Sequence, residues 1–122
     1  MKSRLITIAT ICALLLGCKS TQDVSVRPPL MGWNSWNAYM VDISDSIIMN
    51  AADMMVAKGL KDAGYDHVNI DDGYFGYRDS AGYMVPHPQR FPKGMKHVPE
   101  YIHSLGMKAG IYTDAGHNTC GS

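Results

Sequence analysis

The sequence predicts an α/β fold in which short parallel strands alternate with helices. Apolar runs of strand length alternate with longer segments whose apolar residues recur every three or four positions, in the order strand, helix, strand, helix, strand. Glycines stand where the helices should end, and polar side chains gather just after the apolar runs. The pattern suits a doubly wound sheet or the N-terminal part of a (β/α)8 barrel, with about three strands and two helices, and by itself leaves both open.

The first half of this pattern runs from residue 30 to residue 64. A strand is expected at 30–33, where the residues are mostly apolar. Ser44 can cap the helix that follows, because its hydroxyl can accept a hydrogen bond from a free backbone N–H of the first turn. Gly59 and Gly64 are the expected stop signals. The apolar positions of this helix are Ile47, Ile48, Ala51, Ala52 and Met55.

The second half repeats the pattern. A strand is expected at 67–70 and is ended by Asp71-Asp72-Gly73. A long loop rich in glycine, proline and aromatic residues should follow from 74 to 91. The second helix is expected to begin near Pro92, and a third strand should occupy 107–112. The apolar positions of the second helix are Val98, Tyr101, Ile102 and Leu105.

The N-terminus has the pattern of an export signal. Lys2 and Arg4 precede an apolar run at 5–17, which is shorter than the about 20 residues that a membrane-spanning helix needs. The run ends in Leu-Leu-Gly-Cys at 15–18, which resembles the lipobox of bacterial lipoproteins. We therefore expect a signal peptide at 1–17, lipid on Cys18, a tether at 18–28 and a location in the bacterial cell envelope, anchored to the membrane. The alternative is an ordinary cleaved signal in which Cys18 is incidental.

The remaining cysteines follow from this assignment. Cys12 lies inside the signal, so Cys120 would have no partner in the mature chain. Export allows disulfides to persist, which favours a bond from Cys120 to a cysteine beyond Ser122. The alternative is a buried free thiol.

Composition and missing motifs exclude several classes of protein. Lys+Arg and Asp+Glu both number 11, and hydrophobic residues make up 46%. This balance argues against nucleic-acid binding by bulk charge and against a disordered chain. The chain has no glycine-rich phosphate loop, no HExxH zinc motif and no GxSxG elbow, and its histidines have no ligand spacing. We expect neither a metal nor a cofactor.

Aromatic and acidic residues near the strand ends are typical of a sugar site. Flat aromatic faces cover the apolar side of a pyranose, while carboxylates accept hydrogen bonds from its hydroxyls. The alternatives are that the tryptophans fill the core and that the Asp-Asp-Gly segment is only a turn. The cleft candidates are Trp33, Trp36, Asp71, Asp72, Tyr74 and Tyr112, and Asn34 and Asp114 also follow predicted strands.

Several ordered motifs between 29 and 122 closely resemble glycoside hydrolase family 27. They are MGWNSWN at 31–37, GLKDAGY at 59–65, NIDDG at 69–73, FPKGM at 91–95, HSLG at 103–106 and GIYTDAG at 110–116. This family contains the α-galactosidases and α-N-acetylgalactosaminidases. The resemblance implies a (β/α)8 barrel followed by a β-sandwich, and retaining hydrolysis of a terminal α-galactoside.

The same resemblance implies roles for individual residues. Trp36 would form the aromatic wall of the galactose pocket, and Asp71 and Asp72 would bind the hydroxyls at carbons 4 and 6. Tyr112 would line the pocket, and Cys120 would form a disulfide with a cysteine next to the strand of the nucleophile.

The catalytic residues are expected elsewhere. In the family the nucleophilic Asp lies on the fourth strand and the acid/base Asp on the sixth, so the resemblance puts both beyond Ser122. We expect the sequence to be the incomplete N-terminal portion, residues 29–122, of an α-galactosidase catalytic domain, inactive alone and acting on galactosides of oligosaccharides or polysaccharides. Two alternatives stay open: a related glycosidase for α-N-acetylgalactosamine or β-L-arabinopyranose, and a non-catalytic, lipid-anchored glycan-binding protein.

Overall fold

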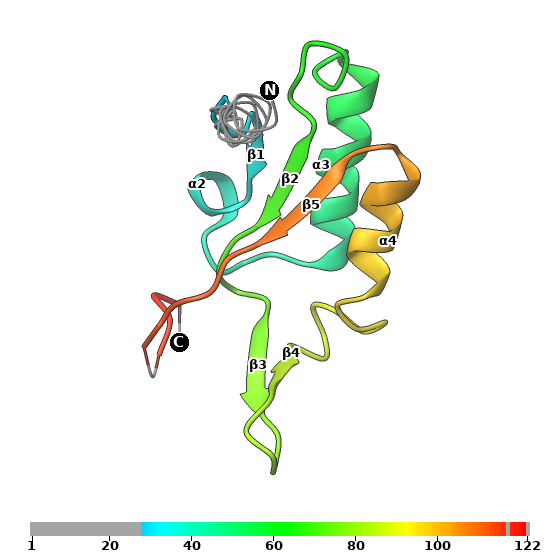
Figure 1. Ribbon diagram of the computed structural model, residues 1–122. Helices are drawn as coiled ribbons and strands as arrows, with labels where there is room; N and C mark the ends of the chain where they lie inside the picture. The colour runs from blue at the N-terminus through cyan, green and yellow to red at the C-terminus, as the bar shows by residue number, and fades with distance from the viewer. Residues whose placement is uncertain (1–27, 117, 122) are drawn as a thin grey trace, which may run out of the picture.

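Three parallel strands form the central sheet of the computed structural model, which describes residues 28–116 and 118–121 (Figure 1). They are β1 (Gly32–Asn34), β2 (His67–Ile70) and β5 (Lys108–Ile111), in the spatial order β1-β2-β5. Trp33 pairs with Val68, and Val68 with Ala109, so that all three strands end at the same edge of the sheet. The predicted signal peptide, Cys18 and all of the predicted tether except Pro28 lie outside the described residues.

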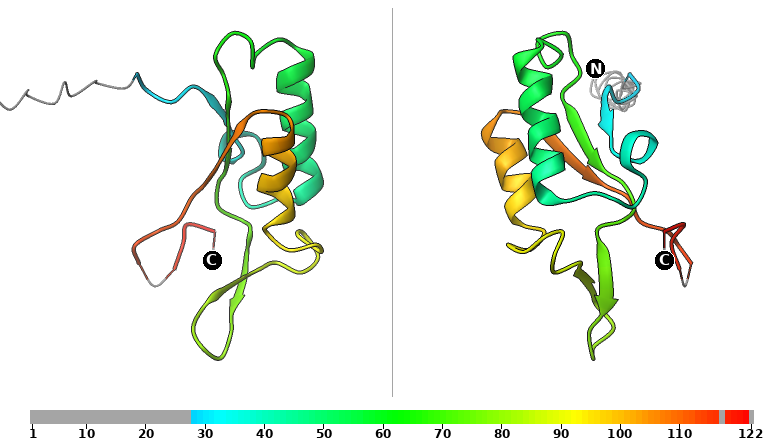
Figure 2. Two further views of the ribbon diagram at one scale, coloured as in Figure 1. Left: turned by 45° about the vertical axis from the view of Figure 1, so that its right-hand side comes forward. Right: turned by 180° about the vertical axis from the view of Figure 1, so that it is seen from behind.

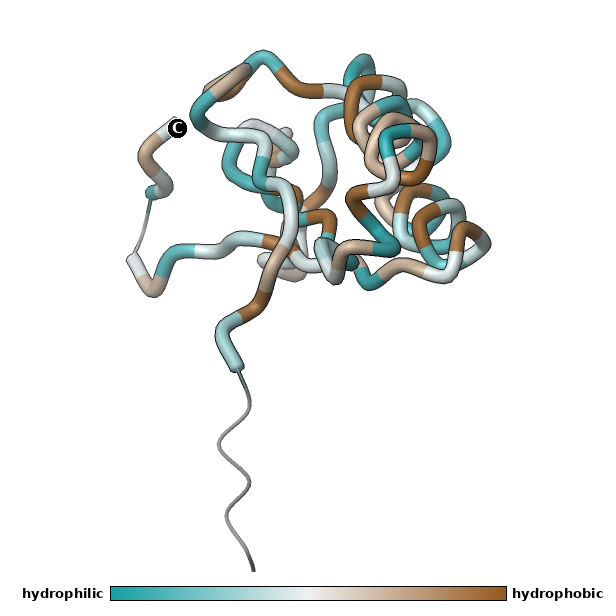
Figure 3. Tube along the Cα trace, turned by 90° about the horizontal axis from the view of Figure 1, so that it is seen from above, coloured by the Kyte–Doolittle hydropathy of each residue, from teal (hydrophilic) through white to brown (hydrophobic). Residues whose placement is uncertain are grey.

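Two helices cover one face of this sheet (Figure 2). They are α3 (Asp45–Ala57), between β1 and β2, and α4 (His97–Ser104), between β2 and β5. Apolar and hydrophilic residues alternate around their turns (Figure 3), and the apolar ones of α3 pack on β2, those of α4 on β5, and the two helices on each other. The core they build includes Ile48, Ala52 and Met55 of α3, Val98 and Ile102 of α4, and Val68 and Ile70 of β2.

The start and end of α3 follow from local chemistry. The Ser44 hydroxyl accepts a hydrogen bond from the Ile47 N–H at 3.3 Å, as the sequence predicts. Asp45 adds a negative charge in the first turn, where the helix dipole favours it. Beyond Ala57 the chain turns through Gly59 and Gly64, which have φ values of 74° and 96° that other residues rarely adopt.

The segment predicted as a loop at 74–91 contains a hairpin, which corrects that prediction. Its strands are β3 (Phe75–Arg78) and β4 (Met84–Pro86), paired antiparallel and projecting beyond the sheet (Figure 1). The turn between them is held by Asp79, whose Oδ1 accepts hydrogen bonds from the N–H groups of Ala81 and Tyr83, both at 2.9 Å. The strands are short and contain a glycine, a proline and an irregular register, so alternation is hard to detect in the sequence.

Element boundaries differ from prediction in smaller ways. The helix expected from Pro92 begins at His97, because residues 92–96 form turns in which Gly94 has a φ of 77°. Leu30, expected in the first strand, is 72% exposed and precedes β1. A short helix that the sequence did not predict, α2 (Trp36–Tyr39), follows β1 directly.

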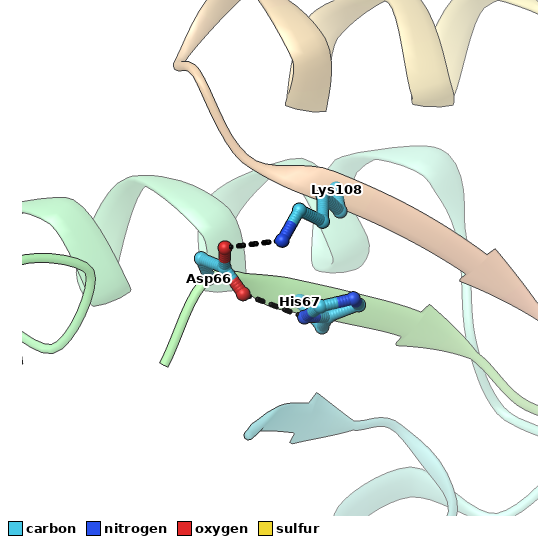
Figure 4. Close-up of polar contacts among 3 residues, drawn as sticks. All are labelled: Asp66, His67 and Lys108. Atoms are coloured by element: carbon cyan, nitrogen blue, oxygen red, sulfur yellow. Dashed lines mark hydrogen bonds and ion pairs between the residues drawn. The ribbon is translucent and has the colours of Figure 1, made fainter. Parts of the chain in front are cut away.

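A polar cluster lies at the opposite end of the sheet, where the strands begin (Figure 4). Asp66 accepts a hydrogen bond from the Lys108 ammonium at 2.8 Å and contacts His67 Nδ1 at 2.6 Å. The hydrogen bond from Lys108 is the main reason that the pKa of Asp66 is lowered. The cluster joins the start of β2 to the start of β5. No helix in the described part of the chain is long and apolar enough to cross a bilayer.

Candidate functional site

A cavity of about 210 Å³ opens at the edge of the sheet where the three strands end. Trp36 begins α2 just after β1, Asp71 and Asp72 follow β2, and Tyr112 follows β5. Cys120 completes the lining from the segment beyond β5. The structure thus brings together the four predicted substrate-binding residues, with Cys120 beside them.

The two tryptophans have different surroundings. Trp33 is half-buried against the hydrophobic core, and its ring meets that of Tyr39 edge-on at a centroid distance of 6.3 Å. Trp36 is also half-buried but lines the cavity, and its backbone N–H donates to Asn34 Oδ1 at 2.9 Å. Filling the core is therefore the role of Trp33, and Trp36 is the aromatic wall of the cavity.

Asp72 lines the cavity although only 2% of its surface is exposed. One carboxylate oxygen accepts a hydrogen bond from the Gly73 N–H at 2.8 Å, and the other accepts from the Gly121 N–H at 2.6 Å. An ionised carboxylate has about four acceptor positions, so these two bonds leave capacity for a ligand hydroxyl. Asp71 is half-buried beside it, and its Oδ1 accepts from the Asp72 N–H at 2.8 Å.

The Asp71-Asp72-Gly73 segment is a tight turn as well as part of the cavity wall. Gly73 has a φ of 102°, and a Cβ at this position would lie 2.5 Å from the Val41 carbonyl oxygen. Its own carbonyl accepts a hydrogen bond from Arg90 at 2.9 Å. Only glycine fits at this position, so the turn has one fixed backbone conformation, which also fixes the positions of Asp71 and Asp72.

Tyr112 is half-buried and keeps its proton to high pH. Its hydroxyl donates to Asp114 Oδ2 at 3.3 Å, and its backbone N–H donates to the Ile70 carbonyl at 2.8 Å. Burial, followed by the hydrogen bond with the Cys120 thiol and the charge of Asp114, raises the pKa of Tyr112 to about 12. The cavity therefore presents a neutral hydroxyl beside two acidic side chains.

The structure decides several open questions about individual residues. Cys120 is exposed and not buried within the described part of the chain. Tyr74 is 6% exposed within the core and does not line the cavity, which corrects its place among the cleft candidates. Asn34 and Asp114 lie at strand ends, as predicted, but act on neighbours: Asn34 on the Trp36 N–H and Asp114 on the Tyr112 hydroxyl.

Sequence reasoning missed the side chains behind the cavity. Ser35 is completely buried, and its Oγ accepts a hydrogen bond from the Asp71 N–H at 3.0 Å. Arg90 reaches the Gly73 carbonyl from a loop 17 residues further along the chain. Ser35 could have been found from the sequence, because it is a small polar residue just after a predicted strand. No sequence feature near Arg90 indicates that its side chain supports the site.

This arrangement suits a neutral, hydroxyl-rich ligand with an apolar face. Carboxylates bind hydroxyl groups by charge-assisted hydrogen bonds, and the indole of Trp36 offers an apolar surface beside them. A monosaccharide has both properties.

Comparison with known proteins gives a consistent family. The family model described as Alpha galactosidase A (Melibiase_2) matches residues 28–122. A probable alpha-galactosidase of Dictyostelium discoideum is 50% identical over 115 residues, which are 94% of this chain and 28% of that protein. The chain thus spans less than a third of this relative's length.

Solved structures agree with the sequence comparison. The crystal structure of alpha-galactosidase I from Mortierella vinacea has a TM-score of 0.73 and 45% identity, over 76% of this chain and 24% of that one. The structure of an alpha-galactosidase from Saccharomyces cerevisiae with raffinose has a TM-score of 0.73 and 40% identity, over 75% of this chain and 20% of that one. Of the two architectures that the strand order allowed, the sheet and its two helices are thus part of a (β/α)8 barrel.

Proposed function

We propose that this chain, which belongs to the alpha-galactosidase A family, forms one wall of the sugar-binding pocket of an enzyme that hydrolyses terminal α-galactosyl residues. The observation that carries the proposal is the cavity lined by Trp36, Asp71, Asp72 and Tyr112. The (β/α)8 architecture supports it, because active sites of such barrels lie where the strands end.

Each lining residue has a chemical role in this proposal. Trp36 covers the C–H face of galactose, and Asp71 and Asp72 accept hydrogen bonds from the hydroxyls at carbons 4 and 6. Galactose and glucose differ only at carbon 4, so a buried carboxylate facing that position would discriminate between them. A glucoside would leave the carboxylate unpaired, and unpaired buried polar groups are costly. Tyr112 adds a neutral hydroxyl.

The catalytic carboxylates belong to other parts of the enzyme in this proposal. Retaining hydrolysis needs a nucleophile and an acid/base roughly 5 Å apart across the bond that is cut. Asp71 and Asp72 are assigned to binding and Asp114 to the support of Tyr112, so none of them takes either role. Both catalytic residues are expected beyond Ser122. The exposed Cys120 is proposed to form a disulfide with a cysteine in the same region.

The test is the activity of the polypeptide encoded by the complete reading frame. We expect hydrolysis of an aryl α-galactoside and release of galactose from raffinose. An aryl α-glucoside, an aryl α-N-acetylgalactosaminide and an aryl β-L-arabinopyranoside serve as matched controls and should react at least 10-fold more slowly. A faster reaction with either of the last two would replace galactose by that sugar, and inactivity on all four would contradict the proposal.

We also propose export and lipid anchoring. The support is the Leu-Leu-Gly-Cys sequence at 15–18 after a short apolar run. Pro28 lines a cavity with Asp66, His67 and Lys108 at the end of the sheet opposite the candidate sugar site. The proposed tether would therefore join the described part of the chain at the end of the sheet opposite the candidate sugar site.

Two cysteine variants test the anchor. Cys18→Ala should abolish lipid labelling and shift the protein out of the membrane fraction, because the thiol is the proposed site of acylation. Cys12→Ala, inside the apolar run, is the matched control and should leave both unchanged. Unaltered labelling and fractionation of Cys18→Ala would show that the signal is of the ordinary cleaved type.

A further inference from the structure

Two buried hydroxyl groups connect the segments that carry the cavity-lining residues. The first belongs to Ser35, none of whose surface is exposed. Its Oγ accepts a hydrogen bond from the Asp71 N–H at 3.0 Å, and its carbonyl accepts from the Tyr39 N–H at 3.0 Å in the turn that begins with Trp36. One residue thus holds the tryptophan wall and the first carboxylate in a fixed relation.

The second hydroxyl belongs to Tyr74. This side chain is 6% exposed, and its hydroxyl donates a hydrogen bond to the Tyr112 carbonyl at 3.0 Å. Tyr74 follows the Asp71-Asp72-Gly73 turn directly, whereas Tyr112 follows β5. Burial raises the pKa of Tyr74, so the hydroxyl remains a donor at any pH near neutrality. The bond ties the end of β2 to the end of β5.

Neither side chain lines the cavity, yet together they connect all three of its walls. We propose that Ser35 and Tyr74 are positioning residues, whose hydroxyls hold Trp36, Asp71, Asp72 and Tyr112 at the separations that a single sugar ring requires. This inference rests on the proposed function. It goes beyond it by assigning part of the sugar affinity to two residues that make no contact with the sugar.

A purely structural role makes a different prediction. If the two hydroxyls only stabilise the fold, their removal lowers the melting temperature and leaves the properties of the remaining folded enzyme unchanged. If they position the binding groups, their removal weakens sugar binding in the folded enzyme as well. The KM for an aryl α-galactoside and the dissociation constant of galactose separate the two roles, whereas stability does not.

The principal experiment compares Tyr74→Phe with Tyr101→Phe in the polypeptide from the complete reading frame. Each variant loses one phenolic hydroxyl that donates one hydrogen bond, to Tyr112 in the first case and to Asp53 on α3, at 2.7 Å, in the second. For Tyr74→Phe we expect the KM and the galactose dissociation constant to rise about 2- to 10-fold, which is the size of one hydrogen bond. For Tyr101→Phe both constants should stay at the wild-type values.

A second pair keeps the test decisive if Tyr74→Phe folds poorly. Ser35→Ala removes the acceptor of the Asp71 N–H, while Ser104→Ala removes an exposed hydroxyl that donates to the Tyr101 carbonyl at 2.6 Å on α4. Ser35→Ala should speed hydrogen exchange of the Asp71 amide and weaken galactose binding about 2- to 10-fold. Ser104→Ala should do neither.

The inference fails if Tyr74→Phe and Ser35→Ala change only the melting temperature while both sugar constants match those of their controls. The proposed function fails on a different result, namely a folded wild-type enzyme that does not hydrolyse α-galactosides. In that case galactose titration by calorimetry still decides whether the two hydroxyls position the binding groups, because it requires no turnover.

Discussion

Asp72 and Asp79 are two acidic residues with different surroundings, since Asp72 follows β2 and Asp79 follows β3. Asp72 is buried, lines the cavity and accepts hydrogen bonds from Gly73 and Gly121. Asp79 is exposed, and its carboxylate accepts hydrogen bonds from Ala81 and Tyr83 in the turn of the β3–β4 hairpin. The first has spare acceptor positions toward the cavity, whereas the second holds a turn.

These surroundings predict different kinetics for the two asparagine variants of the complete enzyme. Asp72→Asn turns one acceptor oxygen into a donor that faces a sugar hydroxyl, at a cost of about 2–4 kcal/mol, so kcat/KM should fall on the order of 30- to 1,000-fold. Asp79→Asn is the control of equal size and should keep kcat/KM within about 3-fold. Melting temperatures show whether both variants fold. Near-normal kinetics for Asp72→Asn would show that Asp72 does not bind the sugar and serves only in the turn after β2.

The polar cluster of Asp66, His67 and Lys108 joins β2 to β5 at the end of the sheet away from the cavity (Figure 4). The hydrogen bond from Lys108 favours the ionised carboxylate, so the pKa of Asp66 is lower in the folded protein than in the unfolded chain. The cluster therefore stabilises the fold above the unfolded pKa near 3.8, and this contribution is lost as the pH falls through the folded value.

In the polypeptide from the complete reading frame, Asp66→Asn should lower the melting temperature at pH 7. The difference from wild type should shrink below about pH 4, because Asp66 of the wild type then also becomes protonated. Glu100→Gln is the matched control, because Glu100 pairs with Lys96 at 3.4 Å on an exposed helix surface. Such exposed pairs contribute little, so this control should shift the melting temperature less. A pH-independent difference for Asp66→Asn would show that ionisation of Asp66 is not what stabilises the strands.

The described sheet has open edges. β5 pairs with β2 on one side only, and Ile111 on it is 53% exposed. A neighbouring hollow of about 140 Å³ is lined by Ile70, Met95, Pro99, Ala109, Gly110 and Ile111. An open edge beside an apolar surface favours association with other chains.

Residues 18–122 produced alone should therefore bind a dye that reports exposed apolar surface, and they should aggregate on heating. They should also hydrolyse no aryl α-galactoside above background, because neither proposed catalytic carboxylate is present. Dye fluorescence, light scattering and a hydrolysis assay measure these three outcomes, with the polypeptide from the complete reading frame as control. A soluble monomer with a cooperative melting transition that binds glycans on an array would instead favour the non-catalytic glycan-binding alternative.

Local patterns in the sequence were sufficient for much of the fold. Period and length predicted the β2 strand at 67–70 with its bounds, and the Ser44 cap predicted the start of α3. Both depend on residues that are close along the chain. The resemblance to a known family, carried by short ordered motifs, predicted that Trp36, Asp71, Asp72 and Tyr112 belong to one pocket, and the structure brings them together.

Contacts between residues distant in the sequence could be assigned only from the folded structure. It separated Trp33 in the core from Trp36 in the cavity wall, because burial depends on what packs against a side chain and not on its neighbours in sequence. It paired the strands of the β3–β4 hairpin, whose short irregular register leaves no clear alternation. It also joined Tyr74 to Tyr112, 38 positions away, because such a bond forms only where folding brings the ends of two strands together.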